Sequence, residues 1–291
     1  MTGLNPVLDH LALVVADLEQ ARKTYQRMGF TLSPRSSHKG QIIEGGPVEL
    51  WGAGNHCAMF ENGYFEILGI TDANRHKEHV EVFLNQYQGL HLIALGCDDA
   101  NDAALILRKR MGDGPAPYEV GRDIPCLDGS TLPGKFRILH LADEAFDEAD
   151  LFFIEHLTPD ALWQKDIINQ ANGVVGLKEV MICSQIPDQT CAKLSRILES
   201  KLEYNSGVAS FQLARGRILI AGPDQLEKIY PGIVPPVLPW VAAVNFAVKN
   251  LEETREFLKF QGFDVHETNR HEIWIGLEQS EGAIVAFSPV L

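Results

Sequence analysis

The sequence has little of several features that define other classes of protein. It has five cysteines, an odd number without a CxxC pair, so neither a zinc knuckle nor a disulfide-stapled scaffold is expected. They are Cys57, Cys97, Cys126, Cys183 and Cys191. No apolar run approaches the roughly 20 residues that a membrane-spanning helix needs. The first residues also lack the basic and apolar segments of a signal peptide. We therefore expect a cytoplasmic protein with reduced thiols.

Basic residues are also scarce. The 291 residues include 25 lysines and arginines against 39 aspartates and glutamates, which gives a net charge of −14. Such an acidic chain is poorly suited to bind nucleic acid or an anionic membrane surface. The hydrophobic fraction of 45% is ordinary and supports a sizeable core, which excludes disorder as the main state. The expected partner is a small molecule, and the length allows two domains.

The strongest positive signal is an internal repeat. Residues 10–32 and 243–265 align, and each reads as an apolar strand, an amphipathic helix and a Gly-Phe pair before another strand. Weaker copies occupy residues 91–114 and 179–202. Further short apolar strands follow each of the four copies. The chain thus reads as a fourfold βαβββ pattern.

This pattern predicts an α+β fold of four βαβββ modules arranged as two paired-module domains. One module alone cannot bury both the apolar face of its helix and a face of its sheet, so modules are expected to pair. We predict a first domain at residues 1–157 from modules 1 and 2, and a second domain at 176–291 from modules 3 and 4. Residues 158–175 are predicted to be a helical linker that begins at Thr158. Pairing between modules of two chains, in a homodimer, is the alternative.

Several segments carry a resemblance to a known superfamily. They are LDHLALVVADLEQA (8–21), GAGNHCAMFENGYFEILGI (52–70), GLHLIALGCDD (89–99) and FFIEHLTPDALW (152–163), with Asn-Gly at 172–173. Together with the fourfold repeat, they resemble the glyoxalase-like branch of the vicinal oxygen chelate superfamily. That superfamily includes glyoxalase I, extradiol dioxygenases and the fosfomycin and bleomycin resistance proteins. The resemblance implies the fold, and it implies the activity more loosely because this fold carries many chemistries.

The resemblance also implies a metal site in the first two modules. Superfamily members place metal ligands in the first and last strands of a module, and these positions here are His10, Glu66, His91 and Glu155. The residues alone point the same way, because histidines and carboxylates inside apolar strands need partners or a cation. Two imidazoles and two carboxylates suit a divalent Zn, Ni, Mn, Co or Fe ion.

The position of Glu155 depends on strand register. Phe153, Glu155 and Leu157 share one face of the predicted strand, whereas Phe152, Ile154 and His156 share the other. A shift of one residue would therefore turn His156 inward in place of Glu155.

The last two modules depart from the metal pattern. Lys178 and Ala243 stand where the first two modules have histidines, and Leu219 and Val285 stand near the position of Glu66. We therefore expect the second domain to lack the metal ligands and to act as a structural wall or a partner surface.

Other residues are candidates to bind substrate in the N-terminal cavity. These are Arg35, His38, Asn55, Arg137 and His156, of which an arginine could hold a substrate carboxylate or phosphate. The histidine-containing run RHKEHVEV (75–82) is expected to be the solvated start of a helix rather than a metal site.

These features favour a metal-dependent enzyme that acts on a small oxygenated metabolite. The metal would chelate neighbouring substrate oxygens, and Glu66 or Glu155 would move a proton as the general base of a glyoxalase-type lyase or isomerase. One alternative is an Fe(II) ring-cleaving dioxygenase that uses His10, His91 and Glu155. Another is a binding or resistance protein that holds a small ligand without chemistry.

Overall fold

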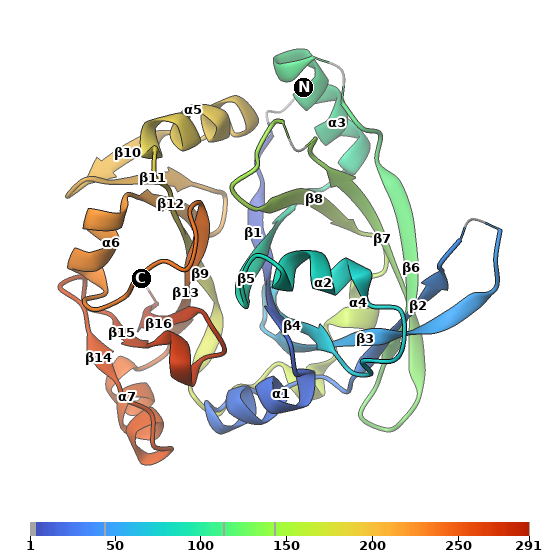
Figure 1. Ribbon diagram of the computed structural model, residues 1–291, viewed down its shortest axis with the longest axis horizontal. Coiled ribbons are helices and arrows are strands. Elements are labelled where there is room, and N and C mark those ends of the chain that lie inside the picture. The colour runs from blue at the N-terminus through green and yellow to red at the C-terminus, as the bar shows by residue number, and fades with distance from the viewer. Residues whose placement is uncertain (1–3, 44, 113, 143, 291) are drawn as a thin grey trace.

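A computed structural model describes residues 4–43, 45–112, 114–142 and 144–290 of the chain. Helices and strands alternate through its whole length, so the predicted α+β class is confirmed. Figure 1 shows two curled sheets side by side, one from each half of the chain, with helices on the outside. None of the helices in the described ranges combines the length and apolar composition needed to cross a membrane.

In the described residues, the first half of the chain contains eight strands and three helices. In order, they are β1 (Val7–Val15), α1 (Leu18–Arg27), β2 (Ser36–Gln41), β3 (Val48–Met59), β4 (Tyr64–Ile70), α2 (Glu78–Leu84), β5 (Gly89–Gly96), α3 (Ala100–Met111), β6 (Tyr118–Pro125), β7 (Thr131–His140) and β8 (Asp150–His156).

The second half repeats a similar order after a short connection. Its elements are α4 (Pro159–Leu162), the 3₁₀ helix η1 (Lys165–Ile167), β9 (Val174–Cys183), α5 (Pro187–Ile197), β10 (Leu202–Asn205), β11 (Val208–Gln212), β12 (Arg217–Ala221), α6 (Pro223–Ile229), β13 (Trp240–Val248), α7 (Leu251–Phe260), β14 (His266–Glu267), β15 (Ile273–Ile275), η2 (Leu277–Gln279) and β16 (Ile284–Pro289).

The helices that open and close the repeat form for the same local reasons. The Asp17 side chain caps α1 by accepting a hydrogen bond from the Gln20 amide, and Asn250 caps α7 in the same way. The end of α1 lies against α7: Gly29 has φ +92°, and a Cβ atom there would lie 2.6 Å from Phe257. Glycine at position 29 thus serves both the left-handed turn and the close packing of the two helices.

The strands of each half surround an interior. In the first half, β1 pairs in parallel with β4 and antiparallel with β5, and β5 pairs in parallel with β8. The open edge strands β2 and β6 approach one another, where Lys39 and Asp123 form an ion pair of 2.7 Å. We call β1–β8 the N-terminal barrel and β9–β16, in which β9 pairs antiparallel with β13, the C-terminal barrel.

The two barrels are joined through their strands and their core. β5 and β13 meet at the pair Leu90 and Val241, which makes the sheet continuous. Phe30, Phe65 and Phe246 pack together, with ring centroids 5.0 Å apart for Phe30–Phe246 and 5.4 Å apart for Phe65–Phe246. They belong to one apolar cluster with members from both halves, whereas the barrel interiors hold separate clusters. Alternating side chains of each strand therefore point to the shared core or into a barrel.

The connection between the halves differs from the predicted linker. Instead of one helix it contains the four-residue helix α4 and the three-residue helix η1. Thr158 precedes α4, but its hydroxyl accepts a hydrogen bond from the Lys135 amide at 2.8 Å and does not cap the helix. Asn172 instead donates to the Met28 carbonyl at 3.0 Å, which ties the segment to the end of α1. The proposed domain boundaries at 157 and 176 stay a prediction.

Candidate functional site

The N-terminal barrel brings His10 and Glu66 into one interior. They lie on the paired strands β1 and β4, where His10 stands beside Tyr64 and Ala12 beside Glu66. The ring of His10 stacks on Tyr64 with centroids 4.2 Å apart. All of these side chains are buried.

His10 takes part in a buried chain of hydrogen bonds. Its Nδ1–H donates to Asp9 at 2.7 Å, and its Nε2 accepts from the Tyr64 hydroxyl at 3.3 Å. His156 Nε2 donates to the same carboxylate at 3.1 Å. Burial raises the pKa of Asp9, but the two imidazoles outweigh burial and hold it well below the ordinary value. His156 therefore points into the barrel, as the alternative register required.

Glu66 also has protein partners. Its Oε1 accepts a hydrogen bond from the Asn55 amide group. Arg122 on β6 is buried over the ring of Phe136, 5.1 Å from the ring centroid. Burial lowers the pKa of this guanidinium, but the Glu66 carboxylate together with Tyr64 and Cys57 outweighs burial, so the net shift is upward. The charge of Glu66 is thus balanced from within the protein.

Glu155 lies on the other face of β8 from His156. Its Oε2 accepts a hydrogen bond from the Ala100 amide, the first residue of α3, at 3.0 Å. Arg137 forms an ion pair with the same oxygen at 2.8 Å and a second pair with Glu119. Both residues were predicted to face the cavity, whereas the structure uses them to hold the start of α3, where a carboxylate is favoured.

His91 is held at the α2 end of the barrel. Its Nε2–H donates to the Tyr87 carbonyl at 2.9 Å, and the two rings stack with centroids 3.9 Å apart. Burial lowers the pKa of His91 to about 4. In the pairing of β1 with β5, Ala94 and not His91 stands opposite His10. The structure thus does not bring the four predicted ligands together.

The donor set tests whether a metal ion fits in the described part of the barrel. There, His, Cys, Asp and Glu side chains form no group of three or more that could hold an ion. The Nε2 lone pair of His10 faces a tyrosine hydroxyl, and Glu66 is engaged by Asn55. The arrangement therefore does not fit a four-ligand metal centre without a change of partners.

The remaining substrate-binding candidates fall in different places. Asn55 lines a small hollow in the N-terminal barrel together with Cys57, Tyr64 and Arg122. Arg35 is exposed and lies 3.7 Å from Glu19 of α1. His38 on β2 contacts His79 of α2, with Nδ1 and Nε2 3.0 Å apart. The run 75–82 does begin a helix, but His79 lies against the barrel and is not freely solvated.

The C-terminal barrel contains a polar cavity that the sequence did not predict. It is lined by residues of β9, β11, β12, α6 and the segment before β15. Four basic side chains, Lys178, Arg217, Lys228 and Arg270, line it with one acidic side chain, Glu272, and this excess of positive charge occurs in a chain of net charge −14. A cavity of this kind favours an anionic ligand.

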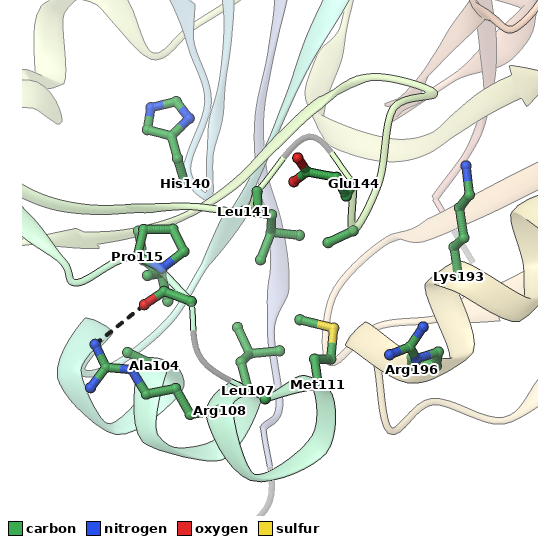
Figure 2. A pocket seen from close by; sticks show the side chains of 15 residues that line it. Ala104, Leu107, Arg108, Met111, Pro115, His140, Leu141, Glu144, Lys193 and Arg196 are labelled. Carbon is green, nitrogen blue, oxygen red and sulfur yellow. Dashed lines mark hydrogen bonds between the residues drawn. The ribbon is translucent and has the colours of Figure 1, made fainter.

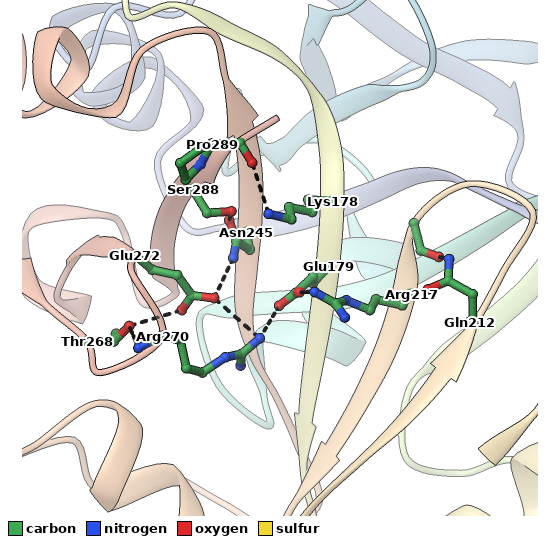
Figure 3. Close-up of polar contacts among 11 residues, drawn as sticks. Lys178, Glu179, Gln212, Arg217, Asn245, Thr268, Arg270, Glu272, Ser288 and Pro289 are labelled. Carbon is green, nitrogen blue, oxygen red and sulfur yellow. Dashed lines mark hydrogen bonds and ion pairs between the residues drawn. The ribbon is translucent and has the colours of Figure 1, made fainter. Parts of the chain in front are cut away.

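Buried carboxylates and guanidinium groups form a network in this cavity (Figure 3). Arg270 lies between Glu179 and Glu272, with nitrogen–oxygen distances of 2.7 and 3.3 Å. Arg217 forms an ion pair with the other oxygen of Glu179. Asn245 donates to Glu272 at 3.0 Å and accepts from Ser288.

Glu272 has the perturbed pKa that is typical of functional sites. Burial raises the pKa of Glu272 to about 7, and Glu179 adds to this rise, while Arg270 and Lys178 oppose it. A carboxyl group that titrates near neutral pH can both accept and donate a proton.

The sequence did not predict this site because the repeats were aligned one residue away from the register of the strands. Alignment of the repeats placed Lys178 at the position of His10. In the strand pairing, however, Glu179 corresponds to His10. His10 pairs with Tyr64, the first interior residue of β4, and Glu179 pairs with Arg217, the first interior residue of β12. A buried glutamate within VGLKEVMIC was the available signal. Arg270 and Glu272 lie in a turn and at the start of a short strand, where the repeat is weakest.

A further cavity lies between the two halves (Figure 2). It is lined by apolar side chains of α3 and β7, such as Leu107, Met111 and Leu139, and by Arg196 of α5. Arg108 turns back to the Gly114 carbonyl, at 3.5 Å. This cavity contains none of the predicted site residues.

The fold and the interiors of the two barrels together define a protein of the vicinal oxygen chelate type, in which curled sheets surround polar cavities. The family model for the glyoxalase-like domain matches residues 8–198, so the chain belongs to the glyoxalase-like domain family. The predicted superfamily is thereby confirmed. No curated protein matches the sequence.

Solved structures share this fold at low sequence identity. A hypothetical protein from Staphylococcus aureus is 15% identical with a TM-score of 0.68, and the match covers 98% of this chain and 100% of that one. A mutant 4-hydroxymandelate synthase from Streptomyces coelicolor is 10% identical with a TM-score of 0.57, covering 98% and 92%. A Mn(II)-bound glyoxalase from Novosphingobium aromaticivorans is 12% identical with a TM-score of 0.53, covering 98% and 82%. At these identities the likeness concerns the fold alone.

Proposed function

We propose that the protein is an enzyme that moves a proton on a small anionic, oxygenated metabolite bound in the C-terminal barrel. The observation that supports this most is Glu272, a buried carboxyl with a pKa of about 7 in a cavity whose other charged side chains are basic. The proposal keeps the lyase or isomerase class predicted from the sequence and moves its site to the other barrel.

Each charged group has a distinct role in this proposal. Arg217, Lys178 and Lys228 line the cavity and would hold the anionic oxygens of the substrate. Glu272 would accept a proton from the carbon next to a carbonyl group, leaving the electron pair on the carbonyl oxygen as an enolate. The basic side chains stabilise that negative charge. Where the carbon that loses the proton bears a hydroxyl group, the intermediate is an enediolate. Glu272 then returns the proton to the former carbonyl carbon while the hydroxyl proton passes to the former carbonyl oxygen, so the product is an isomer of the substrate.

Deuterium exchange tests this role directly. The protein is incubated in D₂O with a panel of 2-oxo and 2-hydroxy acids, and exchange at the carbon next to the carbonyl is followed by NMR. Glu272→Gln should slow exchange by about 10²–10⁴-fold. The matched control Glu278→Gln changes an exposed glutamate of the same half and should leave the rate unchanged. Binding of a panel member without any exchange would instead support a ligand-binding protein.

A divalent metal enzyme with its centre in the N-terminal barrel is the second candidate. His10 and Glu66 favour it because both face the same interior, and Glu66 would have to exchange Asn55 and Arg122 for the ion. Metal analysis of the purified protein tests it: Zn, Ni, Mn or Co lost on both His10→Ala and Glu66→Gln would support this centre. Iron with oxygen-dependent turnover would support the dioxygenase alternative.

The expected partners also remain proposals. We propose a small-molecule ligand and, as the alternative to pairing within one chain, a homodimer. Size-exclusion chromatography with light scattering distinguishes a chain of 32.3 kDa from a pair of chains.

A further inference from the structure

We propose that His38 and His79 form a binding site for one divalent metal ion of the Zn, Ni or Co type at the α2 end of the N-terminal barrel. This site is separate from the residues that the sequence predicted as ligands. It also lies in a different barrel from the proposed proton-transfer site.

The geometry of the two imidazoles carries the proposal. His38 extends from β2 and His79 from the first turn of α2, so the pair joins two elements 41 residues apart. Nδ1 of His38 and Nε2 of His79 are 3.0 Å apart. With metal–nitrogen bonds of about 2.05 Å, this separation corresponds to an angle of about 94° at a shared ion, close to the octahedral ~90°.

The other two ring nitrogens of the pair make no hydrogen bond within the described residues. His38 Nε2 and His79 Nδ1 are both buried and have no hydrogen-bond partner there. A single N–H···N bond thus leaves two buried nitrogens unsatisfied whichever ring donates. A metal ion would replace the His38–His79 hydrogen bond by two metal–nitrogen bonds. The number of ring nitrogens without a partner would stay at two.

The surroundings also suit a cation. Burial lowers the pKa of both rings, that of His38 to about 4, so both are neutral at pH 7, the form that binds metal. The Glu66 carboxylate favours positive charge at His38, and Arg122 opposes it. The ring of Trp51 lies 4.8 Å from that of His79 and covers the pair. The protein thus supplies two ligands, and water or ligand oxygens would fill the other positions, as in open metal sites.

Zinc titration of the whole protein tests the site. The protein is freed of metal with EDTA and titrated with Zn(II) by isothermal calorimetry, while ¹⁵N-histidine NMR reports which ring nitrogens bind. We expect one ion per chain, with shifts at Nδ1 of His38 and Nε2 of His79. His38→Gln and His79→Gln should each weaken binding by about a hundredfold or more, since even a lost outer partner of a ligand costs about 10–100-fold.

Two controls make the result decisive. His266→Gln changes an exposed histidine of the C-terminal barrel and should keep the zinc affinity, whereas His10→Gln reports whether the second candidate centre takes the ion instead. Mg(II), which prefers oxygen ligands, should not compete. The absence of zinc binding, or its loss on His10→Gln with His38→Gln unaffected, would overturn the proposal. If the variants fail to fold, the ¹⁵N shifts of the unmodified protein still decide, because shifts at other histidines would refute it.

Discussion

The two barrels share a backbone plan and differ in what their interiors hold. In the N-terminal barrel, the paired strands β1 and β4 present His10, Tyr64 and Glu66 to the inside. At the matching positions of β9 and β12, the C-terminal barrel has Glu179, Arg217 and Leu219. The same strand positions thus carry a histidine, a tyrosine and a glutamate in one barrel, and part of an arginine–glutamate ion network in the other. The fold fixes where side chains converge, and the residue types fix the chemistry.

The largest expected effect comes from breaking the ion network of the C-terminal barrel. Arg270→Met removes the cation between Glu179 and Glu272 and leaves two buried carboxylates close together. We expect a loss of about 3–5 kcal/mol in the free energy of unfolding, measured by urea denaturation. Arg255→Met removes a pair with the exposed Glu267 and should cost less than about 1 kcal/mol. Equal losses in the two variants would contradict the buried network.

The corresponding change in the N-terminal barrel is Asp9→Asn. It removes the charge that accepts hydrogen bonds from His10 and His156 and should cost about 1–3 kcal/mol at pH 7. Because the folded pKa of Asp9 is depressed, its stabilisation is present above the ordinary pKa and is lost only as the pH falls through the folded value. Unfolding curves of both proteins from neutral pH down to acid should therefore converge only in strong acid. Convergence already near pH 5 would contradict the hydrogen-bonded arrangement.

Anion binding in the C-terminal cavity should depend on pH through Glu272. Below its pKa of about 7 the carboxyl is neutral, and above it the negative charge opposes an anionic ligand. The affinity for oxalate, which stays doubly charged over this range, should therefore fall by up to about tenfold per pH unit above pH 7. Calorimetry at several pH values measures this. In Glu272→Gln the slope should disappear, and a slope that persists would assign the titration to another group.

The smallest expected effect concerns the face of β8 that points away from the barrel. Glu155→Gln removes the charged acceptor for the first amide of α3 and should cost about 1 kcal/mol of stability. It should leave ligand and metal binding unchanged, because the side chain is outside the cavity. Thermal unfolding measures the loss, and calorimetry with oxalate and zinc serves as the control. A loss of zinc binding would contradict this placement of Glu155 and support the prediction that it is a metal ligand inside the barrel.

Much of the fold followed from the sequence because periodicity is a local property. The repeat at 10–32 and 243–265 predicted strands and helices that the structure confirms as β1, α1, β13 and α7. Alternation within β1 and β4 also placed His10 and Glu66 on inward faces. The helical linker was wrong because Thr158, Pro159 and Asn172 are used in tertiary contacts and at a short helix start, and no local pattern reports these.

The site was harder to predict because single-residue offsets decide it. On β8 one position separates Glu155, which holds α3, from His156, which faces Asp9. On β9 one position separates Lys178 from the buried Glu179. Such offsets depend on how neighbouring strands pair, including the register shifts in the β1–β5 and β9–β13 pairs. Repeat alignment cannot supply them.

Tyr87, which lies between α2 and β5, connects the two barrels by hydrogen bonds. Its hydroxyl donates to the Leu90 carbonyl and accepts a hydrogen bond from the Val241 amide of β13, while its ring stacks on His91. A movement of α2 that displaces Tyr87 therefore disturbs β13 of the C-terminal barrel. If a ligand that binds in one barrel causes such a movement, it changes the affinity of the other barrel for its own ligand by some factor. The second ligand then changes the affinity for the first by the same factor.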